Sequence, residues 1–477
     1  MTFTTILFLP FFLIVLILVR ILPVQMRKYA ILLANLVFYA GNGPKALLIL
    51  VSVAAVTYFA GLGIGAAGPT VKGRNYKDGI CLLISIGTVI GLMLFHMTGT
   101  IYPLGMSFYT LSAAGYLIDL YRGRIEPQRR PVDLFVGLSF FSIVQSGPIE
   151  KLPNLMKELD APKTPEEKEV CRAFLQMLWG FLEKLAVSDI ASLLVSEVFD
   201  RYEAHSGVAI ITAVVVFAFQ LYADFDGYSN LAEGSAGLLG IKVTRNFKQP
   251  YLSCSIKEFW RRWHISLSTW LKDYVYIPLG GSRKGNKDLN VFLTFLVSGL
   301  WHGIGLNFAV WGALHGLYQV LEEHWKGFGR HSDKSEDKSE ERDKNEPKRG
   351  ISKALIVIRT FLLADFAWLF FRARDLTSAV SMIRRIFTDL MPQSMSFREE
   401  LAGSGITTMQ LCYLTLVFVM LIVTDLMREK RKGLFERFAT LPMICRTAIC
   451  YAGILLLVLV ALTNLNVNAA GFIYGQF

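Results

Sequence analysis

The sequence is poor in charged residues. Only 18% of its 477 residues are Asp, Glu, Lys or Arg, against about 25% in a typical soluble domain. Hydrophobic residues make up 53% of the chain. Apolar runs of about 18 residues or more recur along it, which is the length that a transmembrane helix requires. The composition argues against an ordinary water-soluble domain and predicts an all-α, polytopic protein in a lipid bilayer.

Paired-cysteine motifs are also lacking. None of the six cysteines stands in a CxxC pair, and several lie inside apolar runs. A disulfide framework or a zinc site is therefore not expected, and no bound metal or cofactor is predicted. The N-terminal run lacks the basic segment and the Ala-x-Ala site of a cleaved signal peptide, which indicates a retained first span.

The net charge of +11 is not accompanied by any nucleic-acid-binding motif. Basic residues collect in the cytoplasmic loops of membrane proteins and face anionic lipids there, so we expect no nucleic-acid partner. Basic clusters follow every second apolar run in the first third of the chain. This alternation predicts roughly 11 spans in a cell (inner) membrane, with the N-terminus and the C-terminus outside.

Three segments depart from simple spans. A Gly/Pro cluster at residues 41–44 divides the apolar run 29–65 into a hairpin. Residues 132–149 contain Gly, Ser, Gln and Pro, so they either span the membrane or dip in and return. The loop at residues 326–350 is dense in both charge signs and is predicted to be cytoplasmic, disordered and without a catalytic role.

Residues 250–316 hold five of the eight tryptophans and three of the seven histidines. Helical spacing over residues 255–274 predicts one amphipathic helix lying in the interface, with its tryptophans at headgroup depth. His264 falls on its apolar face, either as a packed structural histidine or as a residue that orients a donor or acceptor. The predicted face consists of Trp260, Trp263, Leu267, Trp270, Leu271 and Tyr274.

A shorter apolar run ends in Trp301 and His302. From Leu289 to His302 a helix would rise about 20 Å, which is less than the core of about 30 Å. Gly303 and Gly305 then interrupt it. A helix that enters, stops and turns back would place His302 inside the membrane, where an ionisable group is a functional hypothesis by default.

A neutral imidazole has a reference pKa of about 6.5 and can remove a hydroxyl proton near neutral pH. His302 therefore suits the activation of an alcohol that attacks a thioester, the alternative being a helix-packing histidine. His315, on the returning segment, is either a second site residue or a packing residue. Asp224 and Asp226 are functional polar groups or solvated residues at a helix end.

The chain resembles the membrane-bound O-acyltransferase (MBOAT) superfamily, in particular its bacterial alginate and peptidoglycan O-acetyltransferase (AlgI-like) branch. The most specific motif is EFWRRWHISLSTWLKDYVYIPLGGSRKG at residues 258–285. Two segments depart from the family pattern, since DFDG stands for DFSG and FSIVQSGPI for FPQLIAGPI. The other matching motifs are PLGMSFYTLSAAGYLIDLYRG (103–123), SGPIEK (146–151), DFDGYSN (224–230), GLWHG (299–303) and GFIYGQF (471–477).

The resemblance implies one MBOAT domain over residues 1–477, with core motifs in residues 103–316 and with re-entrant or interfacial helices around a central tunnel. It implies His302 as the catalytic histidine, with supporting or substrate-binding roles for His264, His315, Trp301 and Asp224. It also implies acetyl-CoA as a cytoplasmic acyl donor, a polysaccharide acceptor outside, and an extracytoplasmic SGNH-type acyltransferase or polymer-synthesis partner.

Two other readings of the sequence remain open. One is a polysaccharide or lipid transporter, which would show two halves with matching broken helices. The other is a non-catalytic subunit of an envelope-polymer export complex, in which His302 could be replaced without loss of modification. The sequence favours an O-acyltransferase with His302 as general base over both.

Overall fold

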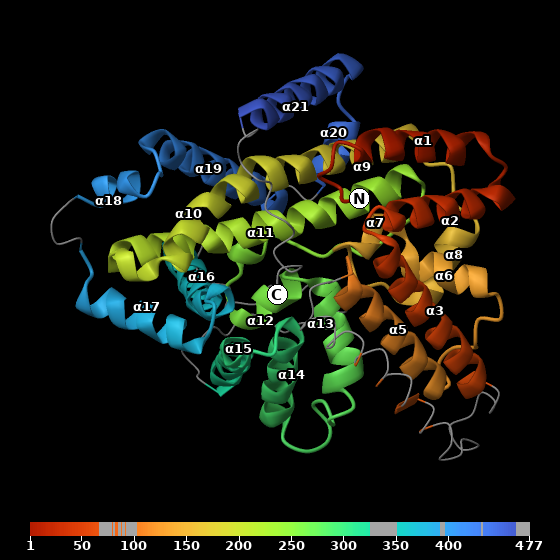
Figure 1. The fold of residues 1–477 in the computed structure, drawn as a ribbon, viewed down its shortest axis with the longest axis horizontal. Helices are drawn as coiled ribbons and strands as arrows, with labels where there is room; N and C mark the ends of the chain where they lie inside the picture. Colours follow the sequence, from red (N-terminus) through yellow and green to blue (C-terminus); the bar gives the residue numbers. More distant parts are fainter. Residues whose placement is uncertain are drawn as a thin grey trace, which may run out of the picture.

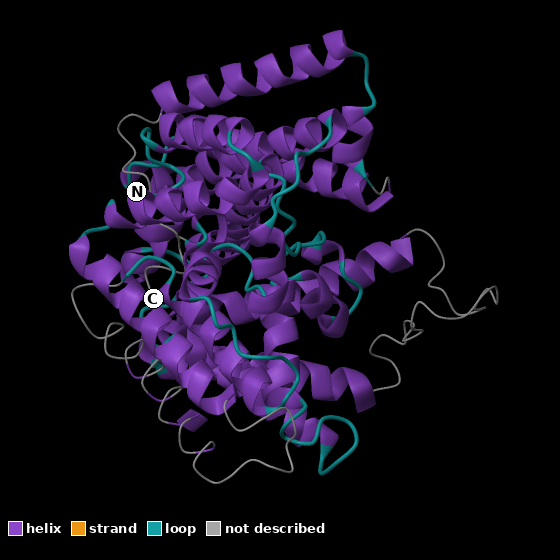
Figure 2. Cartoon of the chain, turned by 90° about the vertical axis from the view of Figure 1, so that its right-hand side faces the viewer, coloured by secondary structure: helices purple, strands orange, loops and turns teal. Residues whose placement is uncertain are grey.

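The described part of the chain is built from helices alone (Figures 1 and 2). The computed structural model describes residues 1–65, 79, 82, 83, 87, 91, 103–324, 351–391, 396–430 and 433–463. The predicted all-α class is confirmed for these residues. The charged segment 326–350 and the C-terminal motif lie outside them, as does most of the predicted span 79–95.

The N-terminal runs form the expected hairpin. Helix α1 (Phe8–Ile21) is followed by α2 (Val24–Ala40) and α3 (Pro44–Gly65). The break between α2 and α3 falls on the Gly/Pro cluster, where Gly43 adopts φ 100°, a value that only glycine reaches without strain. Helix α5 (Met106–Tyr121) then packs along α3.

Residues 132–149 do not form a spanning helix. They fold as α6 (Pro131–Ser139) and α7 (Phe141–Val144), which are followed by α8 (Leu152–Asp160). Nine residues of α6 reach only about 14 Å, far short of a bilayer core. Of the two readings for this segment, the structure excludes a single helical span.

A long helix, α11 (Gly207–Leu238), runs through the middle of the molecule (Figure 1). It packs against a nearly continuous rod of α9 (Glu167–Leu182), the π-helical turn η2 (Glu183–Ser188) and α10 (Asp189–Asp200). Glycines allow the close approach. A Cβ added at Gly180 would lie 2.6 Å from the carbonyl oxygen of Gly227.

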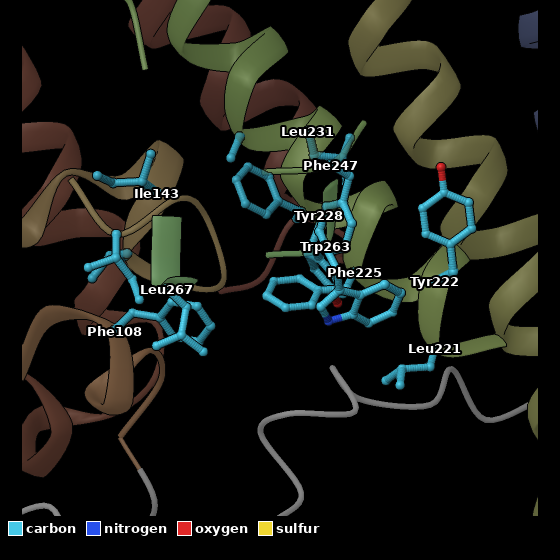
Figure 3. Packing of buried hydrophobic residues seen from close by; sticks show 14 of the residues in the cluster. Phe108, Ile143, Leu221, Tyr222, Phe225, Tyr228, Leu231, Phe247, Trp263 and Leu267 are labelled. Atoms are coloured by element: carbon cyan, nitrogen blue, oxygen red, sulfur yellow. The ribbon is translucent and has the colours of Figure 1, made fainter. Parts of the chain in front are cut away.

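The central stretch does not form the single helix that its spacing predicts. Two short helices, α12 (Ile256–Arg262) and α13 (Ile265–Leu271), are followed by a π-helical turn, η5 (Lys272–Tyr276). Trp260 and Trp263 are buried, so the placement of these tryptophans at headgroup depth is wrong. They pack inside the protein, where Trp263 joins Phe225 and Phe247 in the aromatic core (Figure 3).

The next two helices make an antiparallel hairpin. Helix α14 (Lys287–His302) stops early, and α15 (Leu306–His324) folds back along it. The remaining helices are α16 (Ile351–Arg372), α17 (Leu376–Thr388), α18 (Phe397–Gly403), α19 (Thr408–Lys430), α20 (Leu434–Ala439) and α21 (Met443–Thr463), and the short 3₁₀ turns are η3 (Tyr202–Ala204) and η4 (Pro250–Leu252).

Many large apolar side chains on the outer helices are exposed. Such a surface suits lipid rather than water. Five helices of the described residues are long and apolar enough to cross a membrane. The prediction of roughly 11 spans is not confirmed, because several apolar runs form shorter or interrupted helices. The five are Pro44–Gly65, Gly207–Leu238, Lys353–Arg372, Thr408–Glu429 and Met443–Val460.

The α14–α15 hairpin leads to a first prediction. A Cβ added at Gly312 would lie 2.4 Å from the carbonyl oxygen of Phe295 and 3.2 Å from the Cα of Gly299. Gly312→Ala must push the helices apart and should cost about 1–3 kcal/mol, measured as a lower midpoint of thermal unfolding in detergent. Gly403→Ala is the control, since nothing lies within 4 Å of its added Cβ. Equal midpoints for the two variants would contradict the close packing.

Candidate active site

Helix α14 ends where the sequence indicates. The Asn286 side chain caps its first turn by accepting from the backbone N–H groups of Asp288 and Leu289. Sixteen residues later the helix stops at His302, and Gly303 continues in an extended conformation. The helix is about 24 Å long, so the prediction of a short helix that stops and turns back is confirmed.

His302 lies in an aromatic enclosure. Its side chain is buried, and its ring meets the rings of Trp301, Trp311 and Phe371 edge-on, with centroid distances of 4.6, 5.1 and 5.2 Å. Water has little room in such surroundings, and polar interactions are stronger where water is excluded. The imidazole at the end of α14 is therefore packed against three aromatic rings.

His264 lies at the break between α12 and α13. Its backbone is left-handed, with φ 42° and ψ 56°, which is uncommon for a residue other than glycine. The side chain is buried and packs edge-on against Phe225 at 4.6 Å. Its Nδ1 lies 3.4 Å from Oδ1 of Asn246. The helix break, unforeseen from the spacing, sets the direction of this ring.

Trp301 connects the two histidines. Its ring centroid lies 6.4 Å from that of His264 and 4.6 Å from that of His302. Both imidazoles therefore pack against the same indole ring. The structure therefore brings His264, Trp301 and His302 to one centre.

His315 is fully buried on α15 and lies one ring further from this centre. Trp311 contacts it at 5.1 Å and contacts His302 at the same distance. The indole N–H of Trp260 donates to Nδ1 of His315 over 3.2 Å. An indole nitrogen can only donate, so Nδ1 is the acceptor and Nε2 carries the hydrogen of a neutral His315 ring.

Asp224 does not face the histidines. It lies well inside α11 and is buried, so the alternative of a solvated helix end is wrong. Its Oδ1 lies 2.7 Å from Nζ of Lys184, which also binds Asp189 at 2.7 Å. Ser188 donates to the same Oδ1 over 3.2 Å. The carboxylate thus belongs to an ion cluster between α11 and η2.

Asp226 forms a second buried cluster. Arg428 of α19 lies 3.3 Å from Asp226 and 3.7 Å from Asp425. The neighbouring Asn230 donates to Glu183 over 2.8 Å. Sequence reasoning did not single out Glu183 or Arg428. For Glu183 the sequence did contain a signal. It is a charged residue within the apolar run 171–199, where a buried charge is energetically costly.

A cavity of about 460 Å³ opens beside this region, between the α12–α13–η5 segment and the α14–α15 hairpin. Trp260 and Phe295 form part of its apolar wall. Basic side chains outnumber acidic ones around it. The charged residues that line it are Lys257, Arg261, Lys272, Lys287, Asp288 and Glu323.

The long apolar helices with exposed apolar side chains define a multi-pass membrane protein, and the buried His302 imidazole marks a candidate site inside the bundle. Residues 135–340 match the MBOAT, membrane-bound O-acyltransferase family. The chain is 34% identical to the probable alginate O-acetylase AlgI of Pseudomonas putida over 417 residues, which cover 82% of this chain and 81% of that protein.

Two further relatives agree. The peptidoglycan O-acetyltransferase of Helicobacter pylori is 29% identical, covering 75% of this chain and 73% of its own. The teichoic acid D-alanyltransferase of Streptococcus thermophilus is 27% identical, covering 56% and 68%. The chain belongs to the membrane-bound O-acyltransferase family and is an acyltransferase, which confirms the predicted family and enzyme class. The roles assigned to individual site residues stay predictions.

The Lys184 cluster gives a second prediction. Lys184→Met leaves Asp189 and Asp224 buried without their cation, which should cost about 3–5 kcal/mol and lower both yield and unfolding midpoint. Lys151→Met is the control, because its 2.7 Å pair with Asp273 involves a lysine side chain that is 45% exposed and should contribute about 1 kcal/mol at most. A Lys184→Met protein of normal stability that has lost transfer activity would instead assign Asp224 to the reacting centre.

Proposed function

We propose that the protein passes an acetyl group from acetyl-CoA, on the cytoplasmic side, to a hydroxyl of an extracytoplasmic polysaccharide, with His302 as general base. The observation that carries this proposal is the buried His302 imidazole at the end of α14, enclosed by Trp301, Trp311 and Phe371. The similarity to an alginate O-acetylase and a peptidoglycan O-acetyltransferase supports a polysaccharide acceptor.

In the proposed reaction a neutral His302 ring accepts the hydroxyl proton while the oxygen attacks the thioester carbonyl. A C–O bond forms, and the tetrahedral intermediate carries a negative oxygen beside the new imidazolium. The C–S bond then breaks, and the imidazolium returns the proton to the leaving thiolate. The products are an O-acetyl ester and a free thiol, and the enzyme ends as it began.

The 460 Å³ cavity is the proposed donor entrance. Lys257, Arg261 and Lys272 suit the phosphates of CoA, since lysine and arginine form strong, charge-assisted bonds with phosphate oxygens. A chain of contacts leads inward from its wall. Trp260 donates to His315, and Trp311 contacts both His315 and His302.

The proposal includes a bacterial inner-membrane location with both termini outside, a path through the protein for the acyl group, and a single domain over the whole chain. It also includes a second protein outside the membrane, either an SGNH-type acyltransferase or a component of polymer synthesis. The basic loops of the sequence support the orientation. A transporter or a non-catalytic subunit would differ from this proposal in one consequence, because neither requires His302 for its function.

A third prediction concerns His302. His302→Ala, expressed at the wild-type level, should lower O-acetylation of envelope polymers by about 100-fold or more, since a positioned general base contributes at least that much. O-acetyl content and acetyl-CoA consumption by purified protein are the measurements. His324→Ala is the control, because the His324 side chain is exposed and its Nε2 lies 2.7 Å from the Asp288 carboxylate, away from the aromatic enclosure of His302. Unchanged acetylation in His302→Ala would exclude this mechanism.

A fourth prediction tests the donor entrance. The double variant Lys257→Gln/Arg261→Gln should raise KM for acetyl-CoA about tenfold while kcat stays within about twofold, because lost phosphate contacts weaken ground state and transition state alike. Lys151→Gln removes a lysine that lines a different cavity and should leave both constants unchanged. A fall in kcat with an unchanged KM would contradict a role in donor binding and would assign these residues to the chemical step.

A further inference from the structure

Asn246 lies in the segment between α11 and η4 and contacts the ring of His264. It is fully buried. Its Oδ1 accepts from the backbone N–H of Ser266 over 3.2 Å and from the Ser266 hydroxyl over 2.7 Å. Its backbone N–H donates to Glu233 over 3.3 Å, and its Nδ2 donates to the hydroxyl of Ser229 over 3.4 Å. Hydrogen bonds thus fix both the oxygen and the nitrogen of the Asn246 side-chain amide.

These bonds determine which nitrogen of a neutral His264 ring carries the hydrogen. The Ser266 backbone N–H can only donate, so the amide atom facing it must be the oxygen. That same oxygen lies 3.4 Å from Nδ1 of His264. An oxygen acceptor favours Nδ1 in its protonated form, which leaves the lone pair on Nε2.

Nε2 of His264 lies on the ring edge away from Asn246. It is buried and has no hydrogen-bond partner among the described residues. The ring is enclosed by Phe108, Phe225 and Trp301. The left-handed backbone of His264 restricts the ring further. A buried lone pair is thus presented next to the centre that holds Trp301 and His302.

We propose that Asn246 is a positioning residue that acts through His264. It keeps a lone pair, rather than an N–H group, of His264 directed at the centre, where His302 gains positive charge during transfer. A lone pair stabilises that charge, whereas an N–H dipole would oppose it. This inference rests on the proposed function and adds a residue and a role to it.

Groups from α5, α11 and α14 surround the ring of His264. Helix α14 brings Trp301 to the ring and, on the other side of that indole, the titratable group of His302. Helix α11 brings Phe225 to the ring and Glu233 to the far side of Asn246. Helix α5 brings Phe108. On the element of His264 itself, Arg262 is engaged by Glu258 and Glu429.

The experiment uses full-length protein in detergent, with acetyl-CoA as donor, and records kcat and KM against pH. Asn246→Asp keeps an oxygen acceptor for Ser266 and His264 but adds negative charge. That charge favours the protonated imidazole of His264, which cannot serve as an acceptor. As the pH is lowered, the variant should therefore lose activity at a higher pH than the wild type does. The expected displacement of the acidic limb is about one pH unit or more. Asn246→Ala should lower kcat about tenfold with little change in KM.

Ser266→Ala is the matched control. It removes the hydroxyl bonds to Asn246 and to the backbone N–H of Ile149 but leaves the contact between Asn246 and His264. It should lower the unfolding midpoint without displacing the pH profile. The inference is overturned if the Asn246→Asp profile superimposes on that of the wild type. It is also overturned if Ser266→Ala loses as much kcat as Asn246→Ala at an equal loss of stability.

His302→Ala in the same assay separates this inference from the proposed function. If His302→Ala keeps the wild-type rate, the proposed mechanism fails, and the inference fails with it. If His302→Ala is inactive while Asn246→Asp has the wild-type pH profile, only the role of Asn246 fails. Should Asn246→Ala not fold, the pH profile of Asn246→Asp decides alone.

Discussion

The early end of α14 at Gly303 is the constraint on which the site depends. A chain that stops inside a bundle must turn back within protein, because irregular backbone is not tolerated against lipid. Helix α15 provides this cover and lies so close to α14 that Gly299 and Gly312 leave no room for a side chain between them. Because the two helices meet at backbone contact, His302 and His315 are held at a defined separation, with Trp311 against both rings. A wider hairpin would loosen both histidines together.

The second fixed element is α11, which is held by charge on one side and by aromatic packing on the other. Lys184 binds Asp224 from η2, and Arg428 binds Asp226 from α19. Consecutive residues on a helix point about 100° apart, so Phe225, between the two acids, projects toward His264. Buried ion pairs add little net stability, yet breaking one is costly. The two acids of the DFDGYSN segment thus fix the rotation of α11, and this rotation brings Phe225 against the ring of His264.

The sequence predicted the features that depend on local composition. Long apolar runs gave the helical membrane class, the Gly/Pro cluster gave the break between α2 and α3, and Gly303 gave the end of α14. The break at His264 was not predictable, because no glycine or proline marks it and the helical spacing continues across it. Long-range backbone bonds produce it, since Ile265 donates to the carbonyl of Asn246 and Lys248 donates to that of Arg262. The partners of Asp224 were equally hidden, since they come from another part of the chain.

His264 and His315, which contact His302 through Trp301 and Trp311, differ in hydrogen-bonding character, and their hydrogen-bond partners explain why. Trp260 can only donate, which makes Nδ1 of His315 an acceptor and leaves Nε2 as a buried N–H. The Asn246 oxygen can only accept, which leaves a lone pair on Nε2 of His264. In the proposed reaction an imidazolium and a negative oxygen form together. The lone pair of His264 has the polarity that stabilises the imidazolium, whereas the N–H of His315 lies one ring further away, behind Trp311. Since both tautomers are set by residues outside the reacting centre, the electrostatic preparation of this site resides in its surroundings as much as in His302.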